Sequence, residues 1–320
     1  NARLARARRV STMWHALVIK SVYTLGDLRN WENVISLRQL PIRFGVLGDP
    51  VAHSLSPQMQ NAALKQAKIY AQYARFEIRA AELKAALELM QTLGFWGANL
   101  TVPHKVAALR FVDELDGSAA RAGAINTLVF EADQMRGFNT DGVGASRAIA
   151  EEFSRGLREF RVLLLGAGGA ARAIASQCLE EGVAHLGIWS RTHAAVQQLG
   201  KELAAREGNV SIEVIAPDRD ALFVAAGNAE LIINATPVGL RADDQPLLMR
   251  EAFTKRHFVY DTVYQPSSTR LIEEAKAAGA STANGVSMLL HQGAEAFSLW
   301  IRRPAPLETM REALRRSASS

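Results

Sequence analysis

The chain has 320 residues, 48% of them hydrophobic and 22% charged, so it is long enough for two domains of ordinary globular composition. It contains no run of about 18 apolar residues, and we therefore expect no membrane-spanning helix and no membrane partner. Its one cysteine, Cys178, excludes an intramolecular disulfide and is typical of a reducing compartment. We predict a cytoplasmic protein in which Cys178 is a small buried side chain.

The net charge of +5 arises at the N-terminus. Five basic residues precede the first acidic residue, Asp27, and the rest of the chain holds 32 basic and 32 acidic residues. A neutral body gives no reason to expect a nucleic-acid partner. The basic, acid-free start is either a transit peptide or a dispensable segment, and we favour a partly flexible, dispensable extension over residues 1–40.

Strands and helices alternate in the first part of the chain. Hydrophobic periodicity predicts strands at 43–47, 71–78 and 95–100, separated by helices at 57–66 and 80–93. This order is typical of βαβ units that form a mostly parallel sheet.

A second alternation follows a turn-rich segment at 139–144 and a helix at 145–153. Helices from about residue 288 come after this second sheet is complete, and we expect them to return to the first domain. The fold class is therefore α/β, with a discontinuous first domain (41–140 plus 285–320) and an inserted Rossmann-type dinucleotide-binding domain (141–284). The strands predicted for the inserted domain are 161–165, 186–190, 211–215, 231–235 and 258–263.

A glycine-rich turn follows the strand at 161–165. Gly166 is suited to a tight turn, Gly168 allows the backbone to approach a pyrophosphate, and Ala171 is small enough for close helix packing. The helix start supplies free N–H groups for phosphate. A strand before the turn and a helix after it make this a dinucleotide site rather than a plain turn. Its predicted cofactor-binding residues are Gly166, Ala167, Gly168, Gly169 and Ala170.

The end of the next strand indicates the cofactor. An NAD-binding domain usually carries an acidic residue there, which accepts a hydrogen bond from the ribose 2′-hydroxyl. This chain has Ser190, Arg191 and Thr192 instead. Arg191 can bond a 2′-phosphate that a carboxylate would repel, so we predict NADP; the alternative is a solvent-facing arginine at a strand end.

Three polar clusters lie outside the dinucleotide motif. Ser54 and Ser56 precede a helix, with Ser56 predicted as its N-cap and Pro57 as its first residue. The second cluster, Asn99 to Lys105, ends a strand, and the third, Gly137 to Gly142, lies at the domain junction. Ser56 is explained by capping, but Ser54 is not.

In these clusters the chain resembles the shikimate dehydrogenase family, in order from Phe44 to Trp300. Eight motifs in one order make the resemblance very specific. They are HSLSP (53–57), NLTVPHK (99–105), GAINT (123–127), GFNTDG (137–142), GAGGAA (166–171), NATPVGL (234–240), YDTVYQPSSTRL (260–271) and NGVSMLLHQGAEAF (284–297).

The resemblance implies NADPH-dependent reduction of 3-dehydroshikimate to shikimate, within aromatic amino-acid biosynthesis, with Lys105 and Asp141 as the catalytic pair. A lysine can stabilise and protonate the developing alkoxide while an aspartate orients it. Histidines occur singly, without ligand spacing, so we expect no metal. Further implied contacts are Ser54, Ser56 and Tyr264 to the carboxylate, Thr101, Asn126 and Gln292 to ring hydroxyls, and Thr262 and Gly285 to the nicotinamide.

The chain departs from the family pattern at Ser190, where Asn is usual, at Gln60, where His is common, and at Leu240, where Met is frequent. None of these changes removes a catalytic group. Two other functions are compatible with the sequence. One is a dehydrogenase that prefers quinate, and the other is a relative without catalytic activity that binds the pathway metabolite as a sensor. A monomer and a homodimer are both compatible with the sequence.

Overall fold

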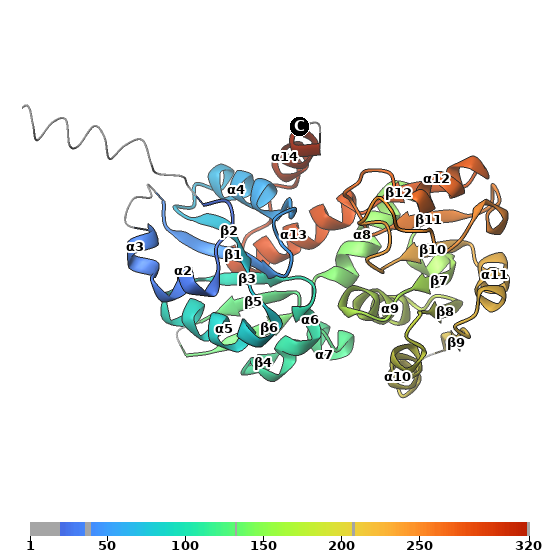
Figure 1. Ribbon diagram of the computed structural model, residues 1–320, viewed down its shortest axis with the longest axis horizontal. Helices are drawn as coiled ribbons and strands as arrows, with labels where there is room; N and C mark the ends of the chain where they lie inside the picture. The colour runs from blue at the N-terminus through green and yellow to red at the C-terminus, as the bar shows by residue number, and fades with distance from the viewer. Residues whose placement is uncertain (1–19, 36–39, 132, 207–208, 319–320) are drawn as a thin grey trace, which may run out of the picture.

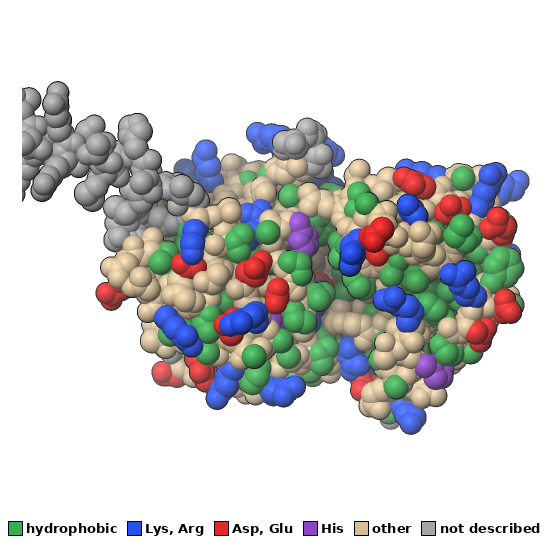
Figure 2. Space-filling model, in the orientation of Figure 1, with side chains coloured by type: hydrophobic (Ala, Val, Ile, Leu, Met, Phe, Trp, Pro, Cys, Tyr) green, Lys and Arg blue, Asp and Glu red, His purple; other side chains and the backbone are tan. Residues whose placement is uncertain are grey.

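The computed structural model describes residues 20–35, 40–131, 133–206 and 209–318. Two six-stranded sheets form two lobes side by side, joined by the helices α8 (Asp141–Phe153) and α13 (Val286–Ile301) (Figure 1). Between the lobes the surface is hollowed on the face drawn in Figure 2.

The first sheet has the strand order β2-β1-β3-β5-β6-β4 and is mixed. β1 pairs in parallel with β2 and β3, whereas β5 pairs antiparallel with β3 and β6. The β5–β6 hairpin was not predicted. The strands are β1 (Ile42–Gly48), β2 (Gln72–Glu77), β3 (Gly97–Leu100), β4 (Glu114–Leu115), β5 (Thr127–Phe130) and β6 (Met135–Phe138).

Helices cover both faces of this sheet. The predicted helix at 80–93 is a 3-10 turn followed by an α-helix, and the segments between β3 and β5 are short. The elements are α4 (Ser56–Gln66), η1 (Ala80–Glu82), α5 (Leu83–Thr92), α6 (His104–Ala107), η2 (Ala108–Arg110), α7 (Gly117–Ala122) and α14 (Leu307–Ala318).

Part of the N-terminal extension packs onto the first sheet. Tyr23 forms a parallel bridge with Phe76 of β2, and Leu28 and Trp31 are buried in the same cluster. These residues lie in or beside the short helices α2 (Leu25–Arg29) and α3 (Trp31–Ile35). Residues 20–35 thus contribute to the core, whereas the basic residues before position 20 lie outside the described part of the chain.

The second sheet is entirely parallel, in the order β12-β11-β10-β7-β8-β9. This is the doubly wound arrangement of dinucleotide-binding domains, in which ligands bind at the carboxyl ends of the strands. β12 was not predicted. The strands are β7 (Arg161–Leu165), β8 (His185–Trp189), β9 (Ser211–Val214), β10 (Leu231–Asn234), β11 (Phe258–Asp261) and β12 (Ser281–Asn284).

Apolar side chains cover both faces of the second sheet, as a buried parallel sheet requires. Cys178 is fully buried on one face, where burial raises the pKa of its thiol to about 12. The remaining elements are η3 (Leu157–Glu159), α9 (Gly169–Glu181), α10 (His193–Ala204), α11 (Arg219–Asn228), η4 (Arg250–Ala252) and α12 (Arg270–Ala277).

The last two helices return to the first sheet. Leu290 and Phe297 of α13, with Met310 and Leu314 of α14, share a core cluster with Phe44 of β1. α13 also packs along α8, so the two helices form the connection between the lobes. Among the described residues, no helix has the length and apolar composition needed to cross a bilayer.

Candidate active site

Lys105 and Asp141 form a nearly buried ion pair between the lobes. Lys105 lies in α6, just after β3, and Asp141 is the first residue of α8. The Nζ atom is 2.5 Å from Oδ2, and the side chains are 16% and 5% exposed. The Nδ2 atom of Asn126 donates to Oδ1 of Asp141 at 2.8 Å. The carboxylate is thus held by an amide on one side and faces the ammonium on the other.

An amide-centred network extends from this pair. The Nδ2 group of Asn126 also lies 2.9 Å from the hydroxyl of Thr140 and 3.4 Å from Oε1 of Gln292. The backbone N–H of Thr140 donates to Oδ1 of Asn126 at 2.8 Å. Gln292, on α13, donates in turn to the carbonyl of Leu289 at 2.8 Å. Asn126, Thr140 and Gln292, which are far apart in the sequence, therefore belong to one hydrogen-bonded network beside the Lys105–Asp141 pair.

The turn that carries Ser54 and Ser56 before α4, called the serine turn below, differs from its predicted geometry. Leu55 occupies the N-cap position, and Ser56 is the first residue of the helix, so the expected N-cap role of Ser56 is wrong. The physical reason is that Leu55 already has helical dihedral angles, so the N–H groups of Gln58 and Met59, which an N-cap at position 56 would bond, donate to the carbonyl of Leu55 instead. Ser54 accepts the hydrogen bond from the backbone N–H of Ser56, at 3.3 Å.

Two tyrosines meet the serine turn. The phenol of Tyr264 is close enough to the backbone of Leu55 and to Ser54, and that of Tyr73 to Ser56, for these groups to lower the phenol pKa values. Burial raises the pKa of both phenols, so both remain protonated and can donate hydrogen bonds. Ser54, Ser56 and Tyr264, which come from two lobes, lie together, and their contact with a carboxylate stays a prediction.

Thr101 follows β3 and packs against the end of the neighbouring strand β1. A Cβ atom at Gly48 would lie 2.4 Å from Cγ2 of Thr101, so this close approach requires glycine at position 48. Because β1 and β3 are parallel, their carboxyl ends bring the serine turn, Thr101 and the segment carrying Lys105 to one edge of the sheet.

The glycine turn between β7 and α9 has the conformation that a dinucleotide site needs. Gly166 has φ of +126°, and a Cβ atom there would lie 2.7 Å from the carbonyl oxygen of Ala235. Gly168 is exposed, and a Cβ atom there would meet nothing within 4 Å, so no protein contact accounts for glycine at this position. Close approach of a ligand to the helix N-terminus does account for it. Ala167, Gly169 and Ala170 are half-buried around the same turn.

The predicted phosphate-selecting residues follow β8. Arg191 and Thr192 are exposed, and the backbone N–H of Thr192 donates to Oγ of Ser190 at 3.3 Å. Asp244, from the loop after β10, accepts from the backbone N–H groups of Gly239 and Arg241. These bonds hold the pKa of Asp244 low, and the charges of Arg241 and Arg191 add to the effect.

Thr262 and Gly285 come together at the carboxyl ends of β11 and β12. A Cβ atom at Gly285 would lie 2.0 Å from the carbonyl oxygen of Thr262, and the N–H of Gly285 donates to the carbonyl of Val263 at 3.1 Å. The turn into α13 therefore depends on glycine at position 285. Both residues lie at the sheet edge where a dinucleotide binds in this fold.

A buried carboxylate, Asp261, supports this edge. It accepts hydrogen bonds from Nδ2 of Asn234 at 2.9 Å, from the N–H of Val263 at 3.0 Å and from the hydroxyl of Thr269 at 2.6 Å. Burial outweighs these bonds and raises the pKa of Asp261 to about 6. Asp261 thus joins the end of β10 to the segment between β11 and α12, beside the predicted cofactor site.

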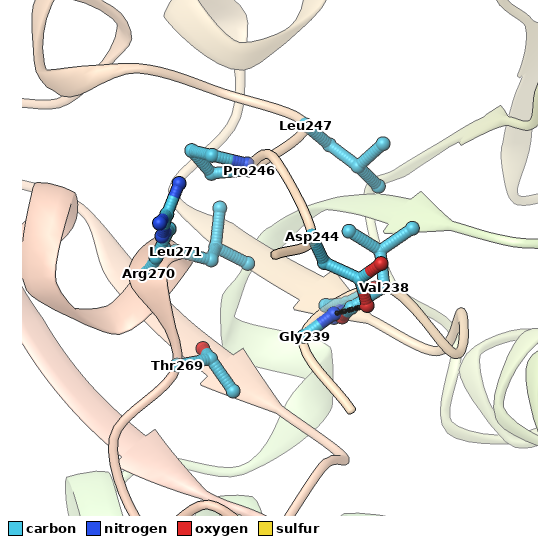
Figure 3. Close-up of a pocket in the computed structure, with 9 residues that line it drawn as sticks. Val238, Gly239, Asp244, Pro246, Leu247, Thr269, Arg270 and Leu271 are labelled. Atoms are coloured by element: carbon cyan, nitrogen blue, oxygen red, sulfur yellow. Dashed lines mark hydrogen bonds between the residues drawn. The ribbon is translucent and has the colours of Figure 1, made fainter. Parts of the chain in front are cut away.

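A small cavity adjoins this cluster (Figure 3). It is lined by Val238, Gly239 and Asp244 on one side and by Thr269 and Leu271 on the other. Its volume is about 10 Å³, room for roughly one water molecule, so it is not a binding site for the dinucleotide.

The histidine in the NLTVPHK motif is structural. His104 is fully buried, its Nε2 atom lies 2.8 Å from the carbonyl oxygen of Ile78, and burial lowers its pKa. The described residues contain no group of three or more His, Cys, Asp or Glu side chains that could hold a metal ion.

The sequence analysis assigned no role to three polar residues behind the site. The hydroxyl of Tyr73 donates to Oδ1 of Asn99 at 2.8 Å, and Nδ2 of Asn99 donates to the hydroxyl of Thr127 at 3.0 Å. These side chains come from three strands of the first sheet, and all are buried. A polar residue within a predicted buried strand was the available signal, because such a group needs a partner.

The fold and the site define a two-lobed α/β protein that combines a Rossmann-type domain with a polar Lys–Asp site facing it. Residues 46–128 match the family described as "Shikimate dehydrogenase substrate binding domain", residues 148–249 match "Shikimate / quinate 5-dehydrogenase", and residues 285–315 match "Shikimate 5'-dehydrogenase C-terminal domain".

Individual proteins of this family are similar to the chain over most of its length. A shikimate dehydrogenase (NADP(+)) of Methanopyrus kandleri is 42% identical over 272 residues, covering 84% of this chain and 93% of that protein. A Thermus thermophilus shikimate 5-dehydrogenase, solved with NADP(H) and shikimate, has a TM-score of 0.76 and 36% identity, covering 86% of this chain and 99% of its own. A quinate dehydrogenase from Corynebacterium glutamicum, solved with NAD, has a TM-score of 0.74 and 31% identity, covering 85% and 98%. The chain belongs to the shikimate dehydrogenase family.

Proposed function

We propose that the protein catalyses the reversible, NADP-dependent reduction of 3-dehydroshikimate to shikimate. The observation that carries this proposal is the Lys105–Asp141 ion pair, which lies between a serine turn suited to a carboxylate and a glycine turn suited to a dinucleotide. Relatives that are about 40% identical carry this activity in their names. Retention of both charged groups disfavours a silent sensor, which needs no proton transfer.

When bound, the nicotinamide cofactor supplies the hydride. The residues that would hold it are the glycine turn 166–170, Ser190, Arg191 and Thr192, and the backbones of Thr262 and Gly285. Lys105 would donate a proton from Nζ to the oxygen that gains charge, since its ammonium is already positioned by Asp141 at 2.5 Å. Asp141 stays fixed during this step because Asn126 holds its other oxygen.

Substrate binding is assigned to polar groups on three sides. The hydroxyls of Ser54, Ser56 and Tyr264 would donate to the carboxylate. Ring hydroxyls would be bound by the amide network of Asn126 and Gln292, by Thr101, and by the catalytic pair. Thr101 is half-exposed at the same sheet edge as the segment that carries Lys105, which supports one common site.

We also propose the domain limits that the sequence suggested: a substrate-binding domain at 41–140 plus 285–320 and a cofactor-binding domain at 141–284. The packing of α13 and α14 on the first sheet supports a discontinuous first domain. A cytoplasmic location and a monomeric or homodimeric state remain proposals, and sedimentation analysis of the purified chain tests the second.

The deciding experiment compares steady-state kcat/KM for shikimate and quinate, each with NADP and with NAD. We expect the highest value for shikimate with NADP. A preference for quinate with NAD would replace the proposal with the quinate alternative, which the similarity to the C. glutamicum enzyme keeps open. The fold by itself cannot make this distinction. No turnover with any pair would favour the sensor.

A further inference from the structure

Arg75 is a half-buried arginine whose acceptors are all neutral. It lies on β2, where Nε and Nη2 donate to the carbonyl oxygen of Ser54 at 2.9 and 2.6 Å, and Nη2 donates to Oε1 of Gln58 at 3.0 Å. None of the ion pairs within the described residues includes it. The other arginine near the end of this strand, Arg79, is exposed and paired with Glu82.

A partly buried cation without a counter-charge is unfavourable, because burial removes hydration that neutral acceptors only partly replace. Burial accordingly lowers the pKa of Arg75, although its guanidinium stays protonated at neutral pH. Such an arrangement is typical of a site that receives an anion, whose charge then offsets the cost of burying the guanidinium.

The surroundings indicate where that anion binds. Arg75 donates hydrogen bonds to the carbonyl oxygen of Ser54. The hydroxyl of the same residue is close enough to the phenol of Tyr264 to affect its pKa. Both Tyr264 and Tyr73 are close enough for their pKa values to respond to the guanidinium. The helix that follows, α4, has no acidic residue in its first turn. The positive charge therefore lies directly behind the serine turn, whose side chains, Ser54 and Ser56, are neutral hydroxyls.

We propose that Arg75 is a positioning and specificity-determining residue that selects a ring bearing a carboxylate over a neutral ring. The hydroxyls of Ser54, Ser56 and Tyr264 make the direct hydrogen bonds, while Arg75 supplies the charge and fixes the turn that carries Ser54. This inference rests on the proposed function, since it assigns the anion to the substrate carboxylate.

The test compares shikimate with its carboxamide, a neutral probe of nearly the same shape, in NADP-linked oxidation. Arg75→Gln removes the charge but keeps an amide donor for the Ser54 carbonyl. We expect it to lower kcat/KM for shikimate about ten- to a hundredfold, mainly through KM, with kcat/KM for the carboxamide nearly unchanged. An equal loss for both substrates, or no loss, would overturn the role of Arg75.

Two further variants complete the design. Arg75→Lys keeps the charge but loses the forked donor, so most of the preference for shikimate over its carboxamide should survive. Loss of this preference in Arg75→Lys would contradict an electrostatic role. This second test remains available if Arg75→Gln does not fold. Arg79→Gln, at the exposed arginine four residues along, is the matched control and should leave the ratio unchanged. Absence of shikimate turnover in the wild-type enzyme would overturn the proposed function itself, whereas an unchanged ratio in an active Arg75→Gln enzyme overturns only the assignment of Arg75.

Discussion

The side chain of Lys105 lies directly against the Cα atom of Gly169. A Cβ atom at Gly169 would be 2.6 Å from Cβ and 3.0 Å from Cδ of Lys105. Gly169 is the first residue of α9 in the second lobe, whereas Lys105 belongs to the first. Besides its predicted role in the dinucleotide turn, the absence of a side chain at position 169 therefore leaves room for the side chain of Lys105 between the lobes.

Gly169→Ala should displace Lys105 and lower kcat about ten- to a hundredfold, since a misplacement of about 1 Å at a catalytic group can cost that much. Steady-state shikimate oxidation at saturating NADP measures the effect. Gly168→Ala is the matched control, because its Cβ atom would enter open space. It should raise KM for NADP and affect kcat less. Wild-type kcat in Gly169→Ala would show that the contact has no catalytic consequence.

Lys105→Ala should lower kcat about 10²- to 10⁴-fold, the usual contribution of a positioned proton donor, while shikimate binding measured by calorimetry weakens far less. Lys84→Ala, at an exposed lysine on α5 paired with Glu88, should change neither quantity. A Lys105→Ala enzyme that kept more than about a tenth of wild-type kcat would refute the assigned role.

Arg191→Ala should lower kcat/KM for NADP about thirty- to a thousandfold and leave that for NAD nearly unchanged, because the 2′-phosphate is the only group that distinguishes the two cofactors. Ser190, in place of the usual Asn, favours the smaller effect. Arg158→Ala provides a control, since Arg158 is exposed just before the amino end of β7, whereas Arg191 follows the carboxyl end of β8. Equal losses for both cofactors would contradict the selection by Arg191.

The buried carboxylate of Asp261 predicts a pH dependence of stability. Its pKa is raised from 3.8 to about 6, so the folded state holds a proton that the unfolded state releases between these values. The free energy of unfolding should therefore fall as pH rises from about 4 to about 6, by up to about 3 kcal/mol, and stay level above. Urea unfolding of wild type and Asp261→Asn measures the difference. Parallel pH profiles for the two proteins would show that Asp261 does not titrate in this range.

Local patterns in the sequence were sufficient to predict the fold class, the glycine turn and most strands of the second sheet. These features depend on residues close together in the chain: a strand of buried apolar residues, a glycine that must adopt φ of +126°, and a helix start directly after it. The eight motifs also indicated the family, and through that resemblance they supplied the predicted set of polar site residues.

Only the tertiary structure decided how those residues meet. Asn126 and Gln292 lie 166 positions apart, and they share a hydrogen bond because α13 returns to the first sheet. Ser56 is not the predicted N-cap because the helix begins one residue earlier, with Leu55 at the N-cap position. Arg75, in a strand with no local sign of function, lies behind the serine turn. Such pairings depend on how strands and helices pack across the chain, and no local pattern records that.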